Sequence, residues 1–411
     1  MDKSNYIKHF LIMFSGTVVA QLVNFASYPF LTRMYSPEDF GVFSIFLATA
    51  SAIGMIACGR YDAVIQTSKA YERFAVFKVS QFVNLITTTV CLFVFLAISF
   101  FGEFYFNSIV AVLLGIAIFL TGLCNGASLF ILKHEHYKEN SLSAVLRTLL
   151  TAIPQVGLFY LLPDEIGLIV GFVLGFFAQA IYLLVHIKSK LTWRKSSNFH
   201  VKVMAFKYKH FFQVDVPSQF LSVMSLHLLS YLLLFLYSTK EVGYYSMAFR
   251  LASLPLAVFS ASLSQVFFQK AAKSYREKGR FWLEMRFNVL VALVLAIIIN
   301  VAIFLWSASF IKFYLGEEWL LAADILVLLS PMITANFVYS TISVVPLVIN
   351  KPKILLLVRV FLSLGMLISF LIAHSFVLPL QEYLLIHSFL TSIVYFVFIG
   401  GVTYIVRLKY S

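Results

Sequence analysis

Three arginines lie within long apolar runs of this sequence: Arg147, Arg250 and Arg359. A charge at the centre of a membrane costs about 2.5–3.5 kcal/mol even on permissive scales, so such residues usually serve a function. A guanidinium group stays charged at any working pH and binds phosphate oxygens through paired hydrogen bonds. Arg147 and Arg250 lie about two turns inside their runs, which favours a protein-lined aqueous cavity. Arg359 is closer to an end and can extend toward the interface.

Acidic residues are scarce near these arginines. They lie at helix starts or interfaces, namely Asp62, Asp215, Glu284 and Asp324. We therefore expect a cationic cavity that suits an anionic cargo, and not a pump for organic cations, which would need buried carboxylates. Uncharged hydrogen-bonding groups lie on the first and seventh apolar runs: Gln21, Asn24, Gln219, Ser222, Ser225 and His227. Such groups suit sugar hydroxyls but also join membrane helices to one another, and the sequence leaves both interpretations open.

Composition indicates the kind of scaffold that holds these groups. The chain has 61% hydrophobic and 12% charged residues and a mean hydropathy of +0.91, too little polar surface for a soluble globule of this length. Apolar runs of about 20 residues, the length that crosses a bilayer, follow one another along the chain. We expect an all-α integral membrane protein of about twelve helices, near residues 9–30, 41–59, 76–100, 108–132, 141–162, 167–187, 213–236, 243–268, 285–308, 324–349, 354–377 and 383–406.

The net charge of +13 is unevenly placed. Nearly all lysines and arginines between the runs fall in alternate loops, and the opposite loops hold only Arg33, Lys240 and Lys312. By the positive-inside rule, both termini are expected to be cytoplasmic. This alternation indicates membrane orientation and not nucleic-acid binding.

A weak internal repeat divides the chain. Residues 8–44 are echoed by residues 209–246, and the turn Tyr35-Ser36 with Asp39 is matched by Tyr237-Ser238 with Glu241. The repeat predicts two six-helix bundles, residues 1–187 and 209–411, related by pseudo-two-fold symmetry around a central cavity, with a basic cytoplasmic linker over residues 188–208. Ser36 and the acidic residues that follow it are expected to cap the second helix.

The cysteines and the loop histidines do not indicate a disulfide, a metal site or a catalytic site. Cys58, Cys91 and Cys124 lie in apolar runs, so neither a disulfide nor a zinc site is expected. In the loop over residues 133–140, His134 and His136 alternate around Glu135 with no partner to complete a metal site. We expect a solvated loop there, no metal, no cofactor and no catalytic residue.

Several segments together resemble a known family. They are residues 15–21 (SGTVVAQ), 32–43 (TRMYSPEDFGVF), 60–65 (RYDAVI), 242–255 (VGYYSMAFRLASLP) and 316–323 (GEEWLLAA). In order and spacing they resemble the polysaccharide-transporter family, the Wzx-type flippases of O-antigen and capsule units within the multidrug/oligosaccharidyl-lipid/polysaccharide (MOP) exporter superfamily.

The resemblance implies a transporter and not an enzyme. It implies a protein of the bacterial inner membrane that moves an undecaprenyl-pyrophosphate-linked oligosaccharide, an O-antigen (lipopolysaccharide) or capsule repeat unit, to the outer leaflet by alternating access. A proton or sodium gradient would drive the cycle, and the polymerase and chain-length regulator of the same pathway would be partners besides membrane lipids. Arg147, Arg250 and Arg359 are then expected to receive the pyrophosphate and glycan.

Three alternatives differ in what they require. A polysaccharide polymerase or ligase, which is an enzyme, would be expected to carry a long outer loop with arginines or histidines, and we expect none here. A lipid II flippase would usually have additional helices and a more heavily charged groove. A membrane scaffold would not need arginines inside its apolar runs.

Overall fold

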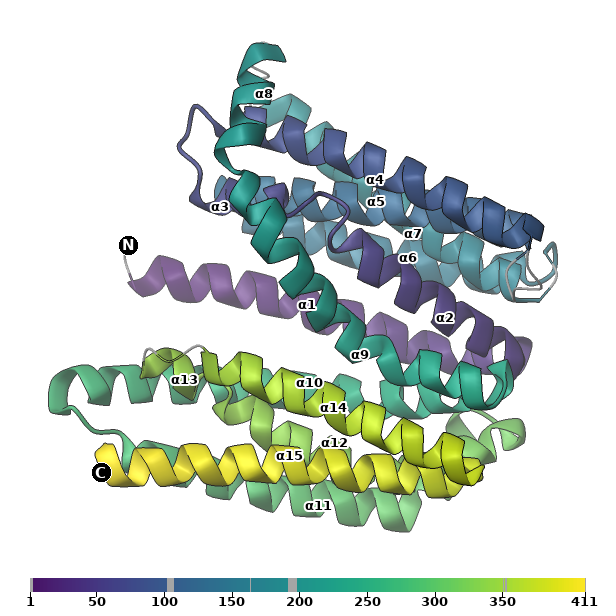
Figure 1. Ribbon diagram of the computed structural model, residues 1–411, viewed down its shortest axis with the longest axis vertical. Coiled ribbons are helices and arrows are strands. Elements are labelled where there is room, and N and C mark those ends of the chain that lie inside the picture. Colours follow the sequence, from purple (N-terminus) through teal and green to yellow (C-terminus); the bar gives the residue numbers. More distant parts are fainter. Residues whose placement is uncertain are drawn as a thin grey trace. The chain divides into compact units, whose positions relative to one another are not determined.

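The computed structural model describes residues 3–101, 107–162, 164–190, 198–349, 351 and 353–410. Within these ranges the chain forms helices joined by turns, and none of the described residues forms a strand (Figure 1). The expected all-α class is confirmed.

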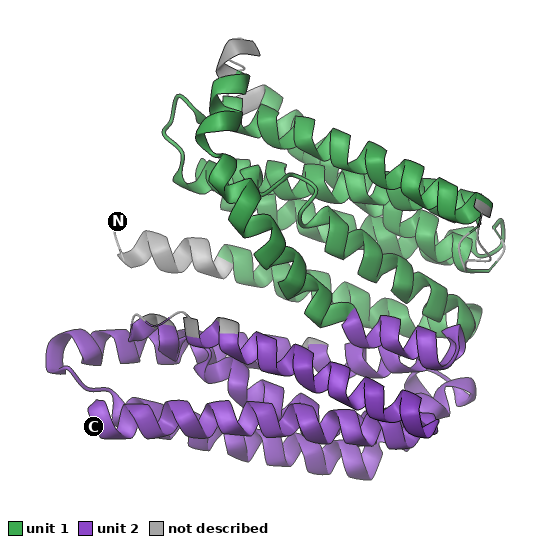
Figure 2. Cartoon of the chain, viewed as in Figure 1, with its two compact units in different colours: residues 1–227 green, residues 228–411 purple. Residues whose placement is uncertain are grey.

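The chain divides into two compact units, residues 1–227 and 228–411 (Figure 2). Unit 1 contains α1 (Lys3–Met34), α2 (Pro37–Gly54), α3 (Tyr61–Thr67), α4 (Arg73–Phe101), α5 (Ser108–Lys133), α6 (Tyr137–Leu158), α7 (Glu165–Lys190), α8 (Asn198–Lys207), η1 (Phe211–Asp215) and the first part of α9 (Val216–Leu236). Unit 2 contains the rest of α9, α10 (Thr239–Lys278), α11 (Trp282–Tyr314), η2 (Glu317–Trp319), α12 (Leu320–Ile342), α13 (Val345–Val348), α14 (Lys353–Phe376) and α15 (Leu380–Lys409). The bundles over residues 1–187 and 209–411 and the linker over 188–208 stay predictions, and residues 191–197 lie outside the described ranges.

Ten helical segments of the described chain are long and apolar enough to cross a membrane. Together with α1 and α2, they correspond to the twelve ranges expected from the sequence. Three expected ranges end early, and the fifth is helical only to Leu158. The second is helical only to Gly54, and the chain then turns through Gly59 and Arg60, whose φ angles are 59° and 62°, before α3 begins. The tenth breaks after Ile342, four residues before Pro346, which has no backbone N–H to donate to the carbonyl O of Ile342.

The two units use the same pattern of helix packing. In unit 1, α5 packs against α2, α4 and α7, and α7 also packs against α6. In unit 2, α12 packs against α10, α11 and α15, and α15 also packs against α14. The central helices α5 and α12 belong to the two most buried membrane-spanning segments in the described chain. The packing of each unit, taken by itself, therefore supports the internal repeat.

The repeated turn forms similar caps in both units. Ser36 precedes α2, where its Oγ accepts a hydrogen bond from Asp39 N at 3.2 Å and its own N donates to Asp39 Oδ2 at 2.8 Å. Ser238 precedes α10, where its Oγ accepts a hydrogen bond from Lys240 N at 3.2 Å and contacts the Glu241 carboxylate. Both turns therefore place an N-cap serine beside a carboxylate three residues later. The expected cap of α2 is confirmed.

The tyrosines of this turn fill matching roles. Tyr35 OH donates to the carbonyl O of Gln155, near the end of α6, at 2.8 Å. Tyr237 OH donates to the carbonyl O of Leu378, just after α14, at 2.9 Å. Each hydroxyl thus satisfies a backbone acceptor at the end of a later helix, which ties the turn to its own unit.

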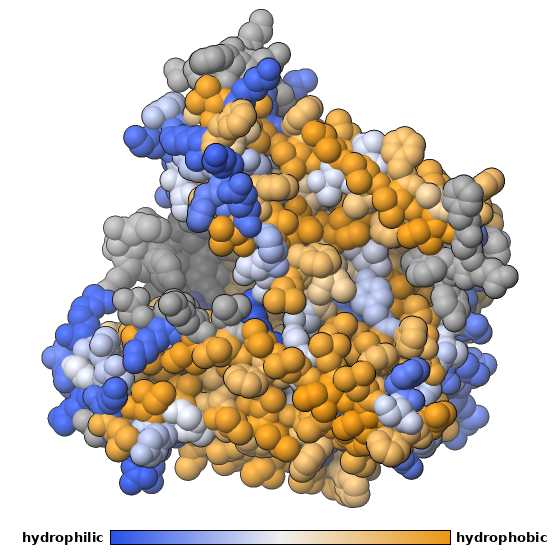
Figure 3. Space-filling view, in the orientation of Figure 1, coloured by the Kyte–Doolittle hydropathy of each residue, from blue (hydrophilic) through white to orange (hydrophobic). Residues whose placement is uncertain are grey.

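The surface of unit 2 suits a hydrocarbon environment. In Figure 3, apolar residues cover the middle of the helices and hydrophilic residues gather toward their ends. Large apolar side chains are exposed there, including Phe304 on α11, Phe361 on α14 and Phe396 on α15. The arrangement agrees with helices that contact lipid in their middle portions.

Polar contacts attach the short helix α8 to the rest of unit 1. Lys207 forms an ion pair with Glu72, and Tyr208 OH donates to Glu72 Oε2 at 2.7 Å. Tyr61 OH donates to the carbonyl O of Ala205 in α8 at 2.9 Å. The Glu72 side chain is only 2% exposed, so α8 and the residue after it provide the partners that a buried carboxylate needs.

The charge of Glu72 should hold α8 in place. Burial raises the pKa of Glu72, but hydrogen bonds from Lys207 and Tyr208 outweigh it and hold that pKa below its ordinary value of 4.5. A lowered carboxyl pKa stabilises the docked state above the ordinary pKa, and this stabilisation is lost as the pH falls through the lower, folded-state value.

We predict that Glu72→Gln increases the backbone hydrogen exchange of α8 near neutral pH, since the ion pair is removed. In the unmodified protein, the protection of α8 should persist at neutral pH and decline in acid below about pH 4.5. Glu277→Gln is the control, because Glu277 forms an exposed pair with Lys273 on α10. Unchanged exchange of α8 in Glu72→Gln would show that the ion pair does not hold it.

Candidate functional site

Two glycines of α7 bring its backbone close to α6. A Cβ atom at Gly175 would lie 1.9 Å from Thr151 Oγ1 and 2.7 Å from the carbonyl O of Arg147. A Cβ atom at Gly171 would lie 2.4 Å from Gln155 Cγ. The segment Gly171-Phe-Val-Leu-Gly175 is a Gly-x-x-x-Gly pattern, which allows close helix contact in membranes. The close contact positions the part of α6 that carries Arg147.

Arg147 is half-buried on α6 and oriented by side chains of α7. One guanidinium nitrogen donates to Gln179 Oε1 at 3.4 Å, and Cζ lies 4.9 Å from the ring centroid of Phe176. Gln179 Nε2 donates in turn to Ser143 Oγ at 3.3 Å, and Ser143 donates to the carbonyl O of Asn140 at 2.7 Å. The amide of Gln179 therefore directs its oxygen toward the arginine.

The environment of Arg147 orients the charge without neutralising it. Among the described residues, the salt bridges do not include Arg147. An amide oxygen and an aromatic face attract a guanidinium but carry no net charge. Arg147 therefore retains a full positive charge, together with donor groups that can bind an anion.

Helix α1 lies beside α6 and contributes Gln21. Ser141 Oγ on α6 donates to the carbonyl O of Ile12 at 3.0 Å, and Tyr35, just after α1, contacts the end of α6. The two helices run in the same direction, so Gln21 and Arg147 fall at similar heights between these contacts. Gln21 Oε1 is buried and accepts no hydrogen bond within the described part of the chain. A cationic donor and an amide acceptor thus lie on neighbouring helices.

The other predicted site residues are more dispersed. Asn24 is half-buried on α1, one turn after Gln21, and Gln219 is half-buried on the part of α9 that belongs to unit 1. Arg250 is half-buried on α10 in unit 2. Arg359 is exposed on α14 of the same unit, where it interacts electrostatically with Tyr339 of α12. Arg147, Gln21 and Asn24 therefore lie on contacting helices of unit 1, whereas Arg250 and Arg359 belong to unit 2.

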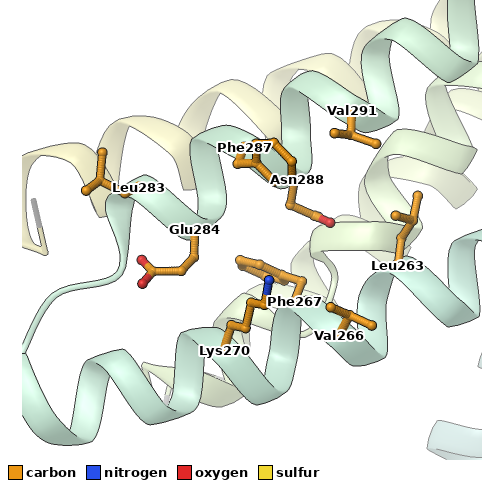
Figure 4. Close-up of a pocket in the computed structure, with 9 residues that line it drawn as sticks. All are labelled: Leu263, Val266, Phe267, Lys270, Leu283, Glu284, Phe287, Asn288 and Val291. Carbon is orange, nitrogen blue, oxygen red and sulfur yellow. The ribbon is translucent and has the colours of Figure 1, made fainter.

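A pocket in unit 2 is lined by none of the six predicted residues. It has a volume of about 300 Å³ and lies between α10 and α11 (Figure 4). Its wall is mostly apolar, formed by Leu263, Val266, Phe267, Leu283, Phe287 and Val291, and its polar residues are Lys270, Glu284 and Asn288. Such a pocket suits a hydrocarbon chain with a polar group near the charged residues.

Sequence reasoning missed Gln179, Phe176 and Ser143. Gln179 was the one sequence feature that could have indicated these contacts, because an uncharged amide in the apolar run of α7 requires a hydrogen-bond partner. The sequence alone did not indicate which residue of α6 it would meet. That pairing depends on the close contact between α6 and α7 at Gly175. Gly175 lies four residues, about one helical turn, before Gln179 and eight residues after Gly167, another close-contact glycine of α7.

Comparisons with known proteins identify relatives. The family described as "Polysaccharide biosynthesis protein" matches residues 30–324. A comparison with curated protein sequences finds no match. Among solved structures, the fold is similar to that of the lipid II flippase MurJ in an inward closed conformation, with a TM-score of 0.70, 18% identity, and 98% of this chain and 87% of that chain covered.

Two further solved structures share the fold. One is a multidrug resistance MATE family transporter of the MOP superfamily in an inward-facing conformation, with a TM-score of 0.66, 15% identity, and 97% of this chain and 98% of that chain covered. The other is a MOP superfamily transporter from Pyrococcus furiosus, with a TM-score of 0.61, 14% identity, and 98% and 95% covered. All three have the architecture described above.

We predict that Gly175→Ala lowers the thermal midpoint of the purified protein. The added methyl group meets the backbone of α6, and overpacking of this kind typically costs about 1–3 kcal/mol. Gly400→Ala is the matched control, because Gly400 is an exposed glycine of α15 with open space around it. Equal midpoints for the two variants would contradict the close α6–α7 contact.

Proposed function

The chain belongs to the family of polysaccharide biosynthesis proteins and has the fold of MOP superfamily transporters, and we propose that it is a flippase for a lipid-linked oligosaccharide. Its cargo is an undecaprenyl-pyrophosphate-linked repeat unit of O-antigen or capsule, as in Wzx-type proteins. The single observation that carries this proposal is the charge of Arg147 within a membrane-spanning helix, where its contacts among the described residues are an amide and an aromatic ring and not a carboxylate.

The proposed cargo matches this charge. A pyrophosphate is the anionic part of the carrier lipid, and a guanidinium group can bind two of its oxygens at once. Gln21 and Asn24 offer amide groups to the sugar hydroxyls next to it. The polyprenyl chain needs no polar site, because it can remain in the hydrocarbon of the bilayer. No bond is made or broken, so the protein acts as a transporter and not as an enzyme.

The repeat suggests how the cargo crosses. Two units with the same internal packing can change their relative orientation as rigid bodies, which exposes a site to one leaflet and then the other. Arg250 and Arg359 of unit 2 are proposed to contribute to the same cationic path. A proton or sodium gradient is proposed as the driving force. In this proposal the protein lies in the bacterial inner membrane with both termini cytoplasmic, as the distribution of basic loops indicates.

A lipid II flippase is the second candidate. The similarity to MurJ, a lipid II flippase, favours it. Both cargoes share the polyprenyl pyrophosphate and differ in the attached group, so Arg147 would serve either one.

We predict that the unmodified gene restores surface polysaccharide to a strain that lacks its own O-antigen or capsule flippase and makes a compatible repeat unit. Arg147→Ala should reduce this activity by about ten- to a hundredfold, since a hydrogen bond to a charged group contributes about 1.5–3 kcal/mol. Arg147→Lys keeps the charge but loses the paired donors, so it should restore only part of the activity.

The control is Arg276→Ala, which removes an exposed arginine at the end of α10. Membrane abundance of each variant is measured by immunoblot, so that loss of protein is not mistaken for loss of transport. Full activity of Arg147→Ala at normal abundance would refute the role of Arg147. Growth of a strain depleted of its lipid II flippase, without any restoration of polysaccharide, would favour the second candidate.

A further inference from the structure

Three potential metal ligands come together where α6 begins and α7 ends. His136 immediately precedes α6, Glu139 lies in its first turn, and His186 lies near the end of α7. One ligand atom from each residue lies within 4.8 Å of the others. His136 Nδ1 is 3.7 Å from Glu139 Oε2, and the rings of His136 and His186 have centroids 4.9 Å apart at 75°.

We propose that His136, Glu139 and His186 form a binding site for a divalent transition-metal ion of the Zn²⁺ class. Two imidazoles and one carboxylate are a set that holds zinc and leaves a fourth position for water. With metal–ligand distances near 2.0–2.1 Å, tetrahedral ligand atoms are about 3.4 Å apart. The longest separation, 4.8 Å, therefore needs to shorten by about 1.4 Å, which side-chain rotation at helix ends can supply.

The histidines of the loop are used in different ways. The ring of His134 packs against Phe130 with centroids 4.8 Å apart, and its Nδ1 lies 2.8 Å from the Phe130 carbonyl O. His136 faces Glu139 and His186 instead, and its side chain makes no capping hydrogen bond to α6. His134 and His136, which are two residues apart in sequence, thus do not form a site together. His186, 50 residues later, is the partner that the sequence pattern did not indicate.

The site is accessible yet partly enclosed. The side chains of His136 and Glu139 are 29% and 21% exposed, so an ion can enter from solution. His186 is buried, and Tyr182, one turn before it, interacts electrostatically with Glu139. An acidic group beside two imidazoles offers more ligand atoms to a metal cation than to an anion.

The position of the site suggests a structural effect. The other ends of α6 and α7 are joined by the short connection between residues 158 and 165. A metal at the His136 end would join the two helices there as well. Arg147 lies 11 residues along α6 from His136, about 16 Å away, and the Ser143–Gln179 hydrogen bond lies between them. The ion would therefore stabilise the helix pair that carries Arg147, whatever the cargo is.

The test uses the full chain, purified in detergent with a histidine-free tag and treated with a chelator. After addition of ZnCl₂ and desalting, elemental analysis should find one zinc per chain, and zinc should raise the thermal midpoint. MgCl₂ should neither leave a retained ion nor raise the thermal midpoint. His136→Ala should weaken zinc binding at least tenfold in an isothermal titration, as losing a ligand exceeds the effect of losing an outer partner.

His134→Ala is the matched control and should bind zinc as the unmodified protein does. Glu139→Gln provides a second, nearly isosteric variant and should also lose binding, which guards against misfolding of a histidine variant. Two results would overturn the site: no retained zinc in the unmodified protein, or equal retention by His136→Ala, Glu139→Gln and the unmodified protein, which would mean adventitious binding only.

Discussion

Water is absent from the hydrocarbon core of a bilayer, and this absence determines most of the structure. Backbone amides and carbonyls there must find partners within the chain, which the helices supply. Helices in lipid gain little from burying apolar surface against one another, so close packing and neutral hydrogen bonds must join them. The contact of Gly171 and Gly175 with α6 and the bond between Gln179 and Ser143 meet both needs at one place.

The same constraint separates two kinds of charge. The Lys312–Glu317 ion pair lies near a helix end, where solvation lowers the cost of a charge, and the buried carboxylate of Glu72 is paired with Lys207. Arg147 instead lies within a membrane-spanning helix and is held by an amide and an aromatic ring. If its charge served only stability, a carboxylate partner would reduce the cost of burial. Under the proposed function, the negative partner is instead a cargo that binds and leaves.

The sequence allowed the helices and the repeat to be predicted because these depend on local patterns. Runs of apolar residues specify membrane spans, and the Tyr-Ser turns of both copies formed similar caps. The partners of Arg147 could not be predicted in this way, since Gln179 lies on another helix and its register depends on contact at Gly175. The grouping of His136 with His186 was missed for the same reason, because it depends on where two helices meet.

The two units share a scaffold but differ at their arginines. Arg147 lies on α6, which packs against α7, and Arg359 lies on α14, which occupies the matching position against α15. Arg147 is half-buried and oriented by an amide, whereas Arg359 is exposed. An arginine that is less ordered before binding loses more conformational entropy when it binds a headgroup. An oriented arginine loses less and selects one geometry. Under the proposed function, Arg147 of unit 1 is therefore the better candidate to hold the pyrophosphate.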